Sequence, residues 1–237
     1  MTRSDDGTPE AGRGDANTEV AILLYDGVTA LDAIGPYEVL RGVPGVTVKF
    51  VAKTPGPVTV DSGLLSLVAN HSLDEVPNPD VLLIPAVDPV AMRDEQVMSW
   101  IRSAHQTSRW TTSVCGGSLL LGAAGLLDGL RATGHWATKE ALEGFGATYS
   151  PEERYVQQGR IVTAAGVSAG IDMALYLACE IAGAKEAQTV QLMIEYDPEP
   201  PFDAGSLAKA PREVAELAHA RVQELAAEFS ADRGTRN

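Results

Sequence analysis

Short apolar runs alternate with amphipathic segments along most of the chain. Largely apolar runs, typical of strands covered on both faces of a parallel sheet, occupy Val20–Tyr25, Val46–Ala52, Asp80–Ile84 and Arg160–Ala164. Helical spacing of apolar residues predicts helices over Ala30–Arg41, Val90–His105, Ser118–Leu127, Lys139–Phe145, Ala169–Ala182 and Ala187–Tyr196. This alternation predicts an α/β fold with a doubly wound, mostly parallel sheet and helices on both faces.

Patterning also divides the chain into three parts. Residues 1–17 are polar and lack the apolar core of a signal peptide, so we interpret them as a disordered tail. The α/β domain is expected over 18–210, followed by a C-terminal helix and short tail at 211–237. That helix has an apolar stripe, which suits docking on its own domain and docking on a partner subunit equally well. The stripe comprises Val214, Leu217, Ala218, Val222, Leu225 and Phe229.

Composition and charge limit the binding partners and the cellular compartment that we expect for this chain. With 45% hydrophobic residues among 237, the chain can bury a sizeable core. Lys and Arg number 18 against 32 Asp and Glu, a net charge of −14 that repels nucleic acid and anionic membrane surfaces. No apolar run reaches the length of a membrane helix. Two cysteines in contrasting settings do not indicate a disulfide framework, so a reducing, cytoplasmic location is expected.

The segment Trp110–Gly122 carries the strongest chemical signal. A strand-like run ends in Cys115, two glycines follow, and an apolar helix begins. Such a sharp strand-to-helix turn projects the side chain at its apex out of the sheet, and glycines supply the backbone freedom that the turn needs. The positive end of the following helix favours the thiolate over the thiol. The pattern therefore predicts a nucleophile elbow with Cys115 as the nucleophile.

The alternative is that a free cysteine simply packs as a small hydrophobic residue. That interpretation suits Cys179, which lies within the apolar helical run Ile171–Ala182. Cys115 differs because it follows a strand directly. Open α/β sheets place their reactive groups at the carboxyl ends of strands.

A cysteine nucleophile usually needs an acid or base within hydrogen-bonding reach. No histidine adjoins Cys115, and His135, in an irregular loop beyond the elbow helix, is expected to line the pocket without acting as a base. Asp32 follows the first strand, so a doubly wound sheet brings it to the same edge as Cys115. It is also suited to N-capping a helix. Beside a thiolate, its carboxyl should have a raised pKa and deliver a proton.

Five motifs occur in order along the chain: Leu31-Asp32 with Gly35–Leu40, the elbow Ser113–Leu127, then Arg131–Trp136, Ala169–Asp172 and Glu195–Ser206. Together they resemble the ThiJ/PfpI superfamily, and within it the isocyanide hydratase branch. The resemblance spans nearly everything from Val20 to Ser206. It implies a flavodoxin-like, class I glutamine amidotransferase-like sandwich, a homodimer, a small-molecule substrate, and no metal or other cofactor.

The resemblance also implies a reaction. Cys115 adds to the terminal carbon of an isonitrile, Asp32 acts as general acid and base, and water converts the cysteine thioimidate to an N-substituted formamide. Backbone N–H groups near Gly116 and Val87 would face the developing charge. The same resemblance places four further residues around the substrate, namely Ala86, His135, Val167 and Ser168.

Two departures from the branch pattern leave alternatives open. Ala86-Val87 stands where the family has two glycines, and Gly116 replaces a threonine whose hydroxyl contacts the site. Ser168 either compensates for that hydroxyl or packs at a turn. A non-catalytic thiol sensor or regulatory small-molecule-binding protein, and a glyoxalase or deglycase activity, remain alternatives. A Cys-His peptidase is disfavoured because its histidine would occupy the position of Gly116.

Overall fold

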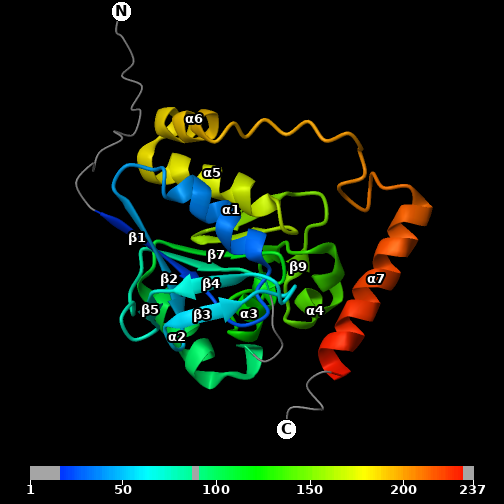
Figure 1. Ribbon diagram of the computed structural model, residues 1–237, viewed down its shortest axis with the longest axis horizontal. Coiled ribbons are helices and arrows are strands. Elements are labelled where there is room, and N and C mark those ends of the chain that lie inside the picture. The colour runs from blue at the N-terminus through cyan, green and yellow to red at the C-terminus, as the bar shows by residue number, and fades with distance from the viewer. Residues whose placement is uncertain (1–16, 87–90, 232–237) are drawn as a thin grey trace, which may run out of the picture.

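The computed structural model describes residues 17–86 and 91–231, with side chains of the last helix described as far as Leu225. The predicted tail therefore falls almost wholly outside the described residues, as does Val87. A seven-stranded sheet with the order β10-β11-β7-β6-β1-β2-β5 forms the centre (Figure 1). Its strands are β1 (Thr18–Leu23), β2 (Val46–Ala52), β5 (His71–Ser72), β6 (Val81–Ile84), β7 (Trp110–Val114), β10 (Tyr155–Gln158) and β11 (Ile161–Ala164).

All neighbouring strands in this sheet are parallel except β10, which pairs antiparallel with β11. Two small sheets are added to it. An antiparallel hairpin joins β3 (Gly56–Thr59) to β4 (Ser66–Ala69), and β8 (Arg131–Ala132) pairs parallel with β9 (Thr148–Tyr149). The predicted doubly wound, mostly parallel α/β fold is confirmed.

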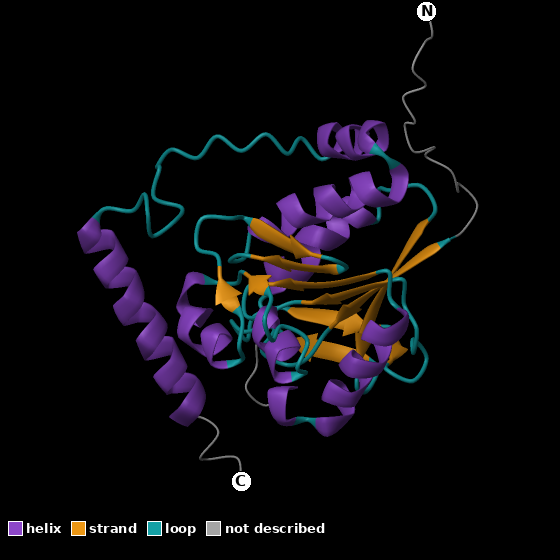
Figure 2. Ribbon diagram, turned by 180° about the vertical axis from the view of Figure 1, so that it is seen from behind, coloured by secondary structure: helices purple, strands orange, loops and turns teal. Residues whose placement is uncertain are grey.

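Helices cover both faces of the sheet (Figures 1 and 2). One apolar layer packs α1, α5 and α6 against the sheet, and the other packs α2, α3 and α4. Alternate β1 residues serve the two layers: Val20 and Ile22 belong to the first, Ala21 and Leu23 to the second. The helices are α1 (Ala30–Leu40), α2 (Glu95–Thr107), α3 (Gly117–Ala123), α4 (Lys139–Gly144), α5 (Ala169–Ala182), α6 (Ala184–Met193) and α7 (Arg212–Ala231).

Helix boundaries shift where side chains cap them. The helix predicted from Val90 begins as α2 only at Glu95, because the Asp94 carboxylate accepts hydrogen bonds from the Gln96 and Val97 amides. The antiparallel edge strand β10 was not predicted, since its sequence Tyr-Val-Gln-Gln contains little apolar signal. Polar residues suit a strand at the edge of a sheet.

Helix α7 lies at one end of the molecule, joined to α6 by a long extended segment (Figures 1 and 2). Its His219 ring lies 4.5 Å from the Trp136 ring, centroid to centroid. Val214, Leu217 and Leu225 on the predicted stripe remain about half exposed. Within the described ranges, no helix is long and apolar enough to cross a membrane.

Glycine is required at position 117, at the start of α3, because the backbone there lies very close to the backbone of β6. A Cβ at this position would lie 2.0 Å from the Ile84 carbonyl oxygen, so β6 would have to move to accept it. We expect Gly117→Ala to lower the free energy of unfolding by about 3 kcal/mol or more, measured by urea denaturation.

Gly144→Ala is the matched control, because nothing lies within 4 Å of a Cβ there. It also ends helix α4, where alanine is favourable. Equal stabilities of the two variants would contradict the close backbone contact at Gly117.

Candidate active site

The elbow forms as predicted at the carboxyl end of β7. Cys115 has φ of 60°, a left-handed conformation that few non-glycine residues adopt. Its amide donates to the carbonyl oxygens of Ala164 (3.1 Å), the last residue of the neighbouring strand β11, and of Ala165 (3.0 Å), the residue after it. The Ser118 hydroxyl donates to the Cys115 carbonyl oxygen at 3.1 Å. These bonds hold the thiol at the sheet edge, partly buried.

Asp32 is fully buried on α1 and reaches the same edge. Its Oδ2 accepts a hydrogen bond of 3.0 Å from the Ala86 amide, just beyond β6. The interpretation of Asp32 as a helix N-cap is wrong. Thr29 occupies the N-cap position, and the Asp32 amide already donates to the Thr29 carbonyl oxygen within the first turn. The carboxyl is therefore free to face the neighbouring strands.

Burial raises the pKa of Asp32 from 3.8 to about 7. The Ala86 amide and the hydrogen-bonded Cys115 thiol favour the carboxylate, and the charge of Asp61 opposes it, but desolvation dominates. The direction agrees with the expectation, although its main cause is burial rather than a neighbouring thiolate. An acid with this pKa can donate and accept protons near neutral pH.

The Gly116 amide at the start of α3 favours the Cys115 thiolate as predicted, but it does not prevail. Burial, followed by the charge of Asp32, raises the pKa of Cys115 from 9.0 to about 12. Backbone amides of Val167 and Gly116 hydrogen-bond to the sulfur and lower the pKa, but less than burial raises it. Short helix α3 alone cannot offset the loss of water around the sulfur.

Asp32 and Cys115 are therefore a coupled pair that shares one proton over a wide pH range. Between about pH 7 and pH 12 the prevailing form is a carboxylate beside a thiol. Transfer of that proton to Asp32 generates a thiolate beside a neutral acid, without net charge change. The arrangement supplies a nucleophile and an acid from one internal proton.

The other predicted substrate residues occupy different places. Val167 and Gly116 present amides to the thiol. The Ala86 amide donates to the Asp32 carboxylate, so it orients that side chain and does not face the substrate. Ser168 is exposed, and its hydroxyl accepts a hydrogen bond from Arg154 at 3.3 Å.

His135 lies beside the turn that follows β11. A Cβ on Gly166 would be 2.7 Å from the His135 Cδ2, and the His135 ring lies 4.8 Å from the Trp136 ring, centroid to centroid, at an interplanar angle of 36°. Burial lowers the pKa of His135, and its Nδ1 accepts a hydrogen bond from the Ala137 amide. A neutral ring in this place suits a wall of the site. No group of three metal-ligating side chains occurs in the part of the chain that the structure describes.

Tyr25, which was not predicted as a site residue, also lies at this edge. Its hydroxyl donates to the carbonyl oxygens of Pro85 and Ala86, the former at 2.6 Å. It thereby supports the segment whose amide binds Asp32. The place of Tyr25 in the sequence could have predicted this role, because it follows the end of β1 as closely as Ala86 follows the end of β6.

Comparisons with known proteins agree with this architecture. An isonitrile hydratase of Pseudomonas putida is 45% identical over 206 residues, covering 86% of this chain and 89% of that protein. The transcriptional regulator CdhR of Pseudomonas aeruginosa is 31% identical over 140 residues, which are 57% of this chain and 40% of the regulator.

Solved structures show the same fold. A ThiJ/PfpI family protein from Pseudomonas syringae superposes with a TM-score of 0.85 at 35% identity, covering 95% of this chain and 96% of that one. DJ-1beta of Drosophila melanogaster, at 21% identity and a TM-score of 0.70, covers 77% of this chain and all of its own. The DJ-1/PfpI family matches residues 18–180, which include Asp32, Cys115 and Val167. The chain is therefore a member of the DJ-1/PfpI family.

Proposed function

We propose that this protein is an isonitrile hydratase, which adds water to an isonitrile to give an N-substituted formamide. The observation that carries the proposal is the buried Asp32 carboxyl beside the Cys115 thiol, close enough for each to shift the pKa of the other, on a strand-to-helix elbow. The 45% identity to the Pseudomonas putida isonitrile hydratase, along most of both chains, supports the same reaction.

In the first step, Asp32 takes the thiol proton as the sulfur of Cys115 attacks the terminal carbon of the isonitrile. A carbon–sulfur bond forms, and the isonitrile triple bond becomes a carbon–nitrogen double bond. The proton held by Asp32 then passes to the same carbon, giving a neutral thioimidate. The amides of Val167 and Gly116 stabilise the sulfur while it carries negative charge.

In the second step, Asp32 acts as a base toward water. Hydroxide adds to the thioimidate carbon as Asp32 takes the water proton, and that proton then passes to nitrogen. Collapse of this adduct breaks the carbon–sulfur bond, and the hydroxyl proton returns the sulfur to a thiol. The products are one formamide and the starting pair, so the sum is isonitrile plus water.

The protonation state weighs against the thiol sensor. Oxidation of a sensor thiol requires a thiolate in the resting protein, and the raised Cys115 pKa leaves little of it at neutral pH. The hydratase avoids this difficulty because Asp32 removes the proton during attack. Glyoxalase or deglycase chemistry would use the same pair, so substrate assays must separate it from hydration.

The direct test is to incubate the protein with an aliphatic and an aromatic isonitrile at pH 8. Formamide formation should be catalytic and follow saturation kinetics by mass spectrometry. A parallel incubation with methylglyoxal should give no lactate. Turnover of methylglyoxal without isonitrile turnover would replace the proposal with the glyoxalase alternative.

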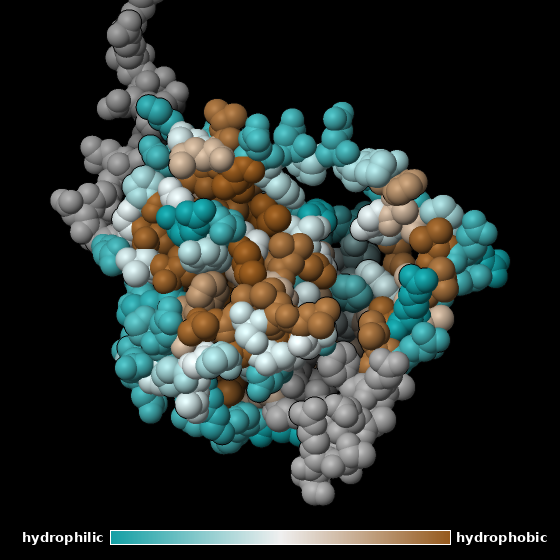
Figure 3. Space-filling model, viewed as in Figure 1, coloured by the Kyte–Doolittle hydropathy of each residue, from teal (hydrophilic) through white to brown (hydrophobic). Residues whose placement is uncertain are grey.

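We also propose a homodimer, formed through the apolar surface over α1 and α5. Figure 3 shows apolar surface gathered over these two helices. A groove there is lined by Leu31, Ile34, Ile171, Met193 and Ile194 among other residues. One self-complementary apolar patch suits a two-fold interface, in which the same patch serves both subunits. A second copy of this chain is thus the proposed occupant.

Met193→Glu should weaken dimer formation at least about tenfold, because it buries an unpaired charge in the interface. Met193 is 72% exposed, so the monomer should tolerate the change. Leu64→Glu, at a side chain 93% exposed near the β3–β4 hairpin, is the matched control and should remain dimeric. Light scattering across a concentration series measures both. Dimers of equal strength would place the interface elsewhere.

A further inference from the structure

The turn of residues 165–168, between β11 and α5, touches Cys115 from two sides. The Ala165 carbonyl oxygen accepts the Cys115 amide at 3.0 Å. The Val167 amide hydrogen-bonds to the Cys115 sulfur. The position of this turn therefore fixes both the backbone of the elbow and the hydrogen bonding of its thiol.

This turn does not hold its conformation by local preference. Val167 has φ of 21°, on the left-handed side that β-branched residues avoid. A residue in such a conformation persists when its surroundings hold it there, at a cost of order 1–3 kcal/mol.

Arg154, just before β10, binds the turn through both backbone and side chain. Its carbonyl oxygen accepts the Ala165 amide at 2.9 Å. Its guanidinium donates from Nη2 to the Ser168 hydroxyl at 3.3 Å and from Nε to Asp172 Oδ2 at 2.7 Å. One side chain thus connects the end of the turn to the first helical turn of α5.

Asp172 is bound on its other side as well. Its Oδ1 accepts a hydrogen bond of 2.8 Å from the Tyr196 hydroxyl. Tyr196 lies in the motif Glu195–Ser206, which the proposed mechanism leaves unused. Both carboxylate oxygens are occupied, so Asp172 has little freedom to turn away from Arg154.

We propose that Arg154, Asp172 and Tyr196 form a clamp of positioning residues, which holds the Val167 amide against the Cys115 thiol. The inference rests on the proposed role of Cys115 as the nucleophile. None of the three is assigned contact with the substrate. Their effect passes through the turn of residues 165–168.

Ordinary stabilisation does not explain the arrangement. The Arg154 and Asp172 side chains are 49% and 26% exposed, and ion pairs of that exposure contribute little to folding free energy. Among the described residues, Asp32 is the one whose charge acts directly on the Cys115 thiol, with Asp61 acting in turn on Asp32. Removing Arg154 should therefore affect Cys115 by moving the turn.

The test measures alkylation of Cys115 by iodoacetamide between pH 6 and pH 10, in a Cys179→Ala background so that one thiol reports. Arg154→Met should lower the alkylation rate at pH 8 about tenfold and shift the pH dependence upward by about one unit, the effect of one lost hydrogen bond to a thiolate. Arg154→Lys should behave almost as poorly, because an ammonium cannot bind Asp172 and Ser168 together in the fork of a guanidinium. Tyr196→Phe should cause a smaller loss.

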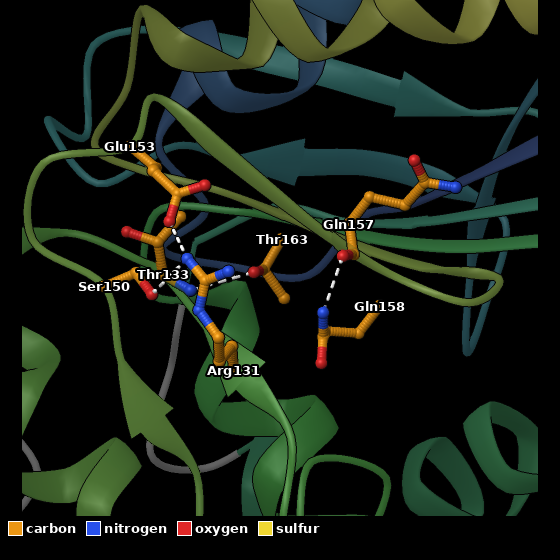
Figure 4. A network of polar contacts seen from close by, with 7 residues as sticks. All are labelled: Arg131, Thr133, Ser150, Glu153, Gln157, Gln158 and Thr163. Atoms are coloured by element: carbon orange, nitrogen blue, oxygen red, sulfur yellow. Dashed lines mark hydrogen bonds and ion pairs between the residues drawn. The ribbon is translucent and has the colours of Figure 1, made fainter.

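Glu153→Gln is the matched control. Glu153 adjoins Arg154 in the chain but pairs with Arg131 (Figure 4), which is not part of the clamp. It should leave the alkylation profile unchanged. An unchanged or faster profile in Arg154→Met, or an equal shift in Glu153→Gln, would overturn the clamp.

Circular dichroism and an assay of hydratase activity distinguish loss of the clamp from misfolding and from failure of the proposed function. Circular dichroism checks folding, and if Arg154→Met does not fold, Ser168→Ala and Tyr196→Phe each remove a single bond of the clamp and must show the same direction. Alkylation does not require turnover of an isonitrile. Shifted alkylation in a protein without hydratase activity would leave the clamp standing and remove the proposed function.

Discussion

Cys115→Ala is expected to abolish formamide production from an isonitrile, with a loss in kcat on the order of 10⁴-fold or more. The reason is that the carbon–sulfur bond of the proposed first step has no substitute atom. Asp32 remains in the variant, but it then has no thiol to deprotonate. Single-turnover and steady-state measurements by mass spectrometry should both show the loss.

Cys179→Ala provides the matched control. Cys179 is also partly buried, but it packs within α5 against the apolar layer of α1 and α6. We expect its removal to leave turnover within about twofold and to cost only the packing of one sulfur atom. Turnover that survives in Cys115→Ala, or vanishes in Cys179→Ala, would exclude Cys115 as the nucleophile.

The fold followed from patterns that burial imposes on sequence. Where strands are covered on both faces, as in β6 and the last four residues of β1, every residue is apolar, so these runs are easily recognised in the sequence. Strand β10 lies at the sheet edge with an exposed face and contains two glutamines, so its sequence has no apolar run from which a strand could be predicted. Apolar periodicity therefore reports interior elements better than edge elements.

The two groups of the site were predicted for a topological reason. Asp32 and Cys115 follow parallel strands, and parallel strands end at one edge. Their protonation was not predictable, because it depends on desolvation by residues distant in sequence. A helix start beside a cysteine suggests a thiolate, whereas the complete surroundings of Cys115 favour the thiol.

Local sequence also misled at Asp32. A short acidic residue near a helix start usually caps that helix. Here the extended Thr29 takes that position, and Asp32 lies one turn further along, where its side chain points to Ala86. A carboxylate at the N-cap position would be structural, whereas Asp32, three residues later, is a candidate catalytic group. The difference depends on how the helix packs in the fold.

A buried acid of this kind costs stability when it ionises. The folded pKa of about 7 lies some three units above 3.8, so the ionised form costs up to about 4 kcal/mol. Stability from the protonated acid is fully present below pH 3.8 and is lost as the pH rises to about 7. The site therefore trades folding free energy for a base that works near neutral pH.

Asp32→Asn should lower the activity and should also remove the cost in stability of ionising Asp32. At pH 8 we expect kcat/KM for an isonitrile to fall by about 10² to 10⁴-fold, because the amide cannot accept the thiol proton. In the unaltered protein, kcat/KM should fall about tenfold per pH unit below pH 7, where Asp32 is protonated and the pair contains no base. That limb should be absent from whatever activity the variant retains.

Urea denaturation should show the opposite effect on stability. An asparagine oxygen can still accept the Ala86 amide but never ionises, so Asp32→Asn should gain stability relative to the parent as pH rises from 4 to 8, by up to about 4 kcal/mol. The Cys115 pKa should also fall, since the charge of Asp32 raises it. A stability difference that does not change with pH would mean that Asp32 titrates normally, and the shared-proton mechanism would then lose the acid that holds the proton near neutral pH.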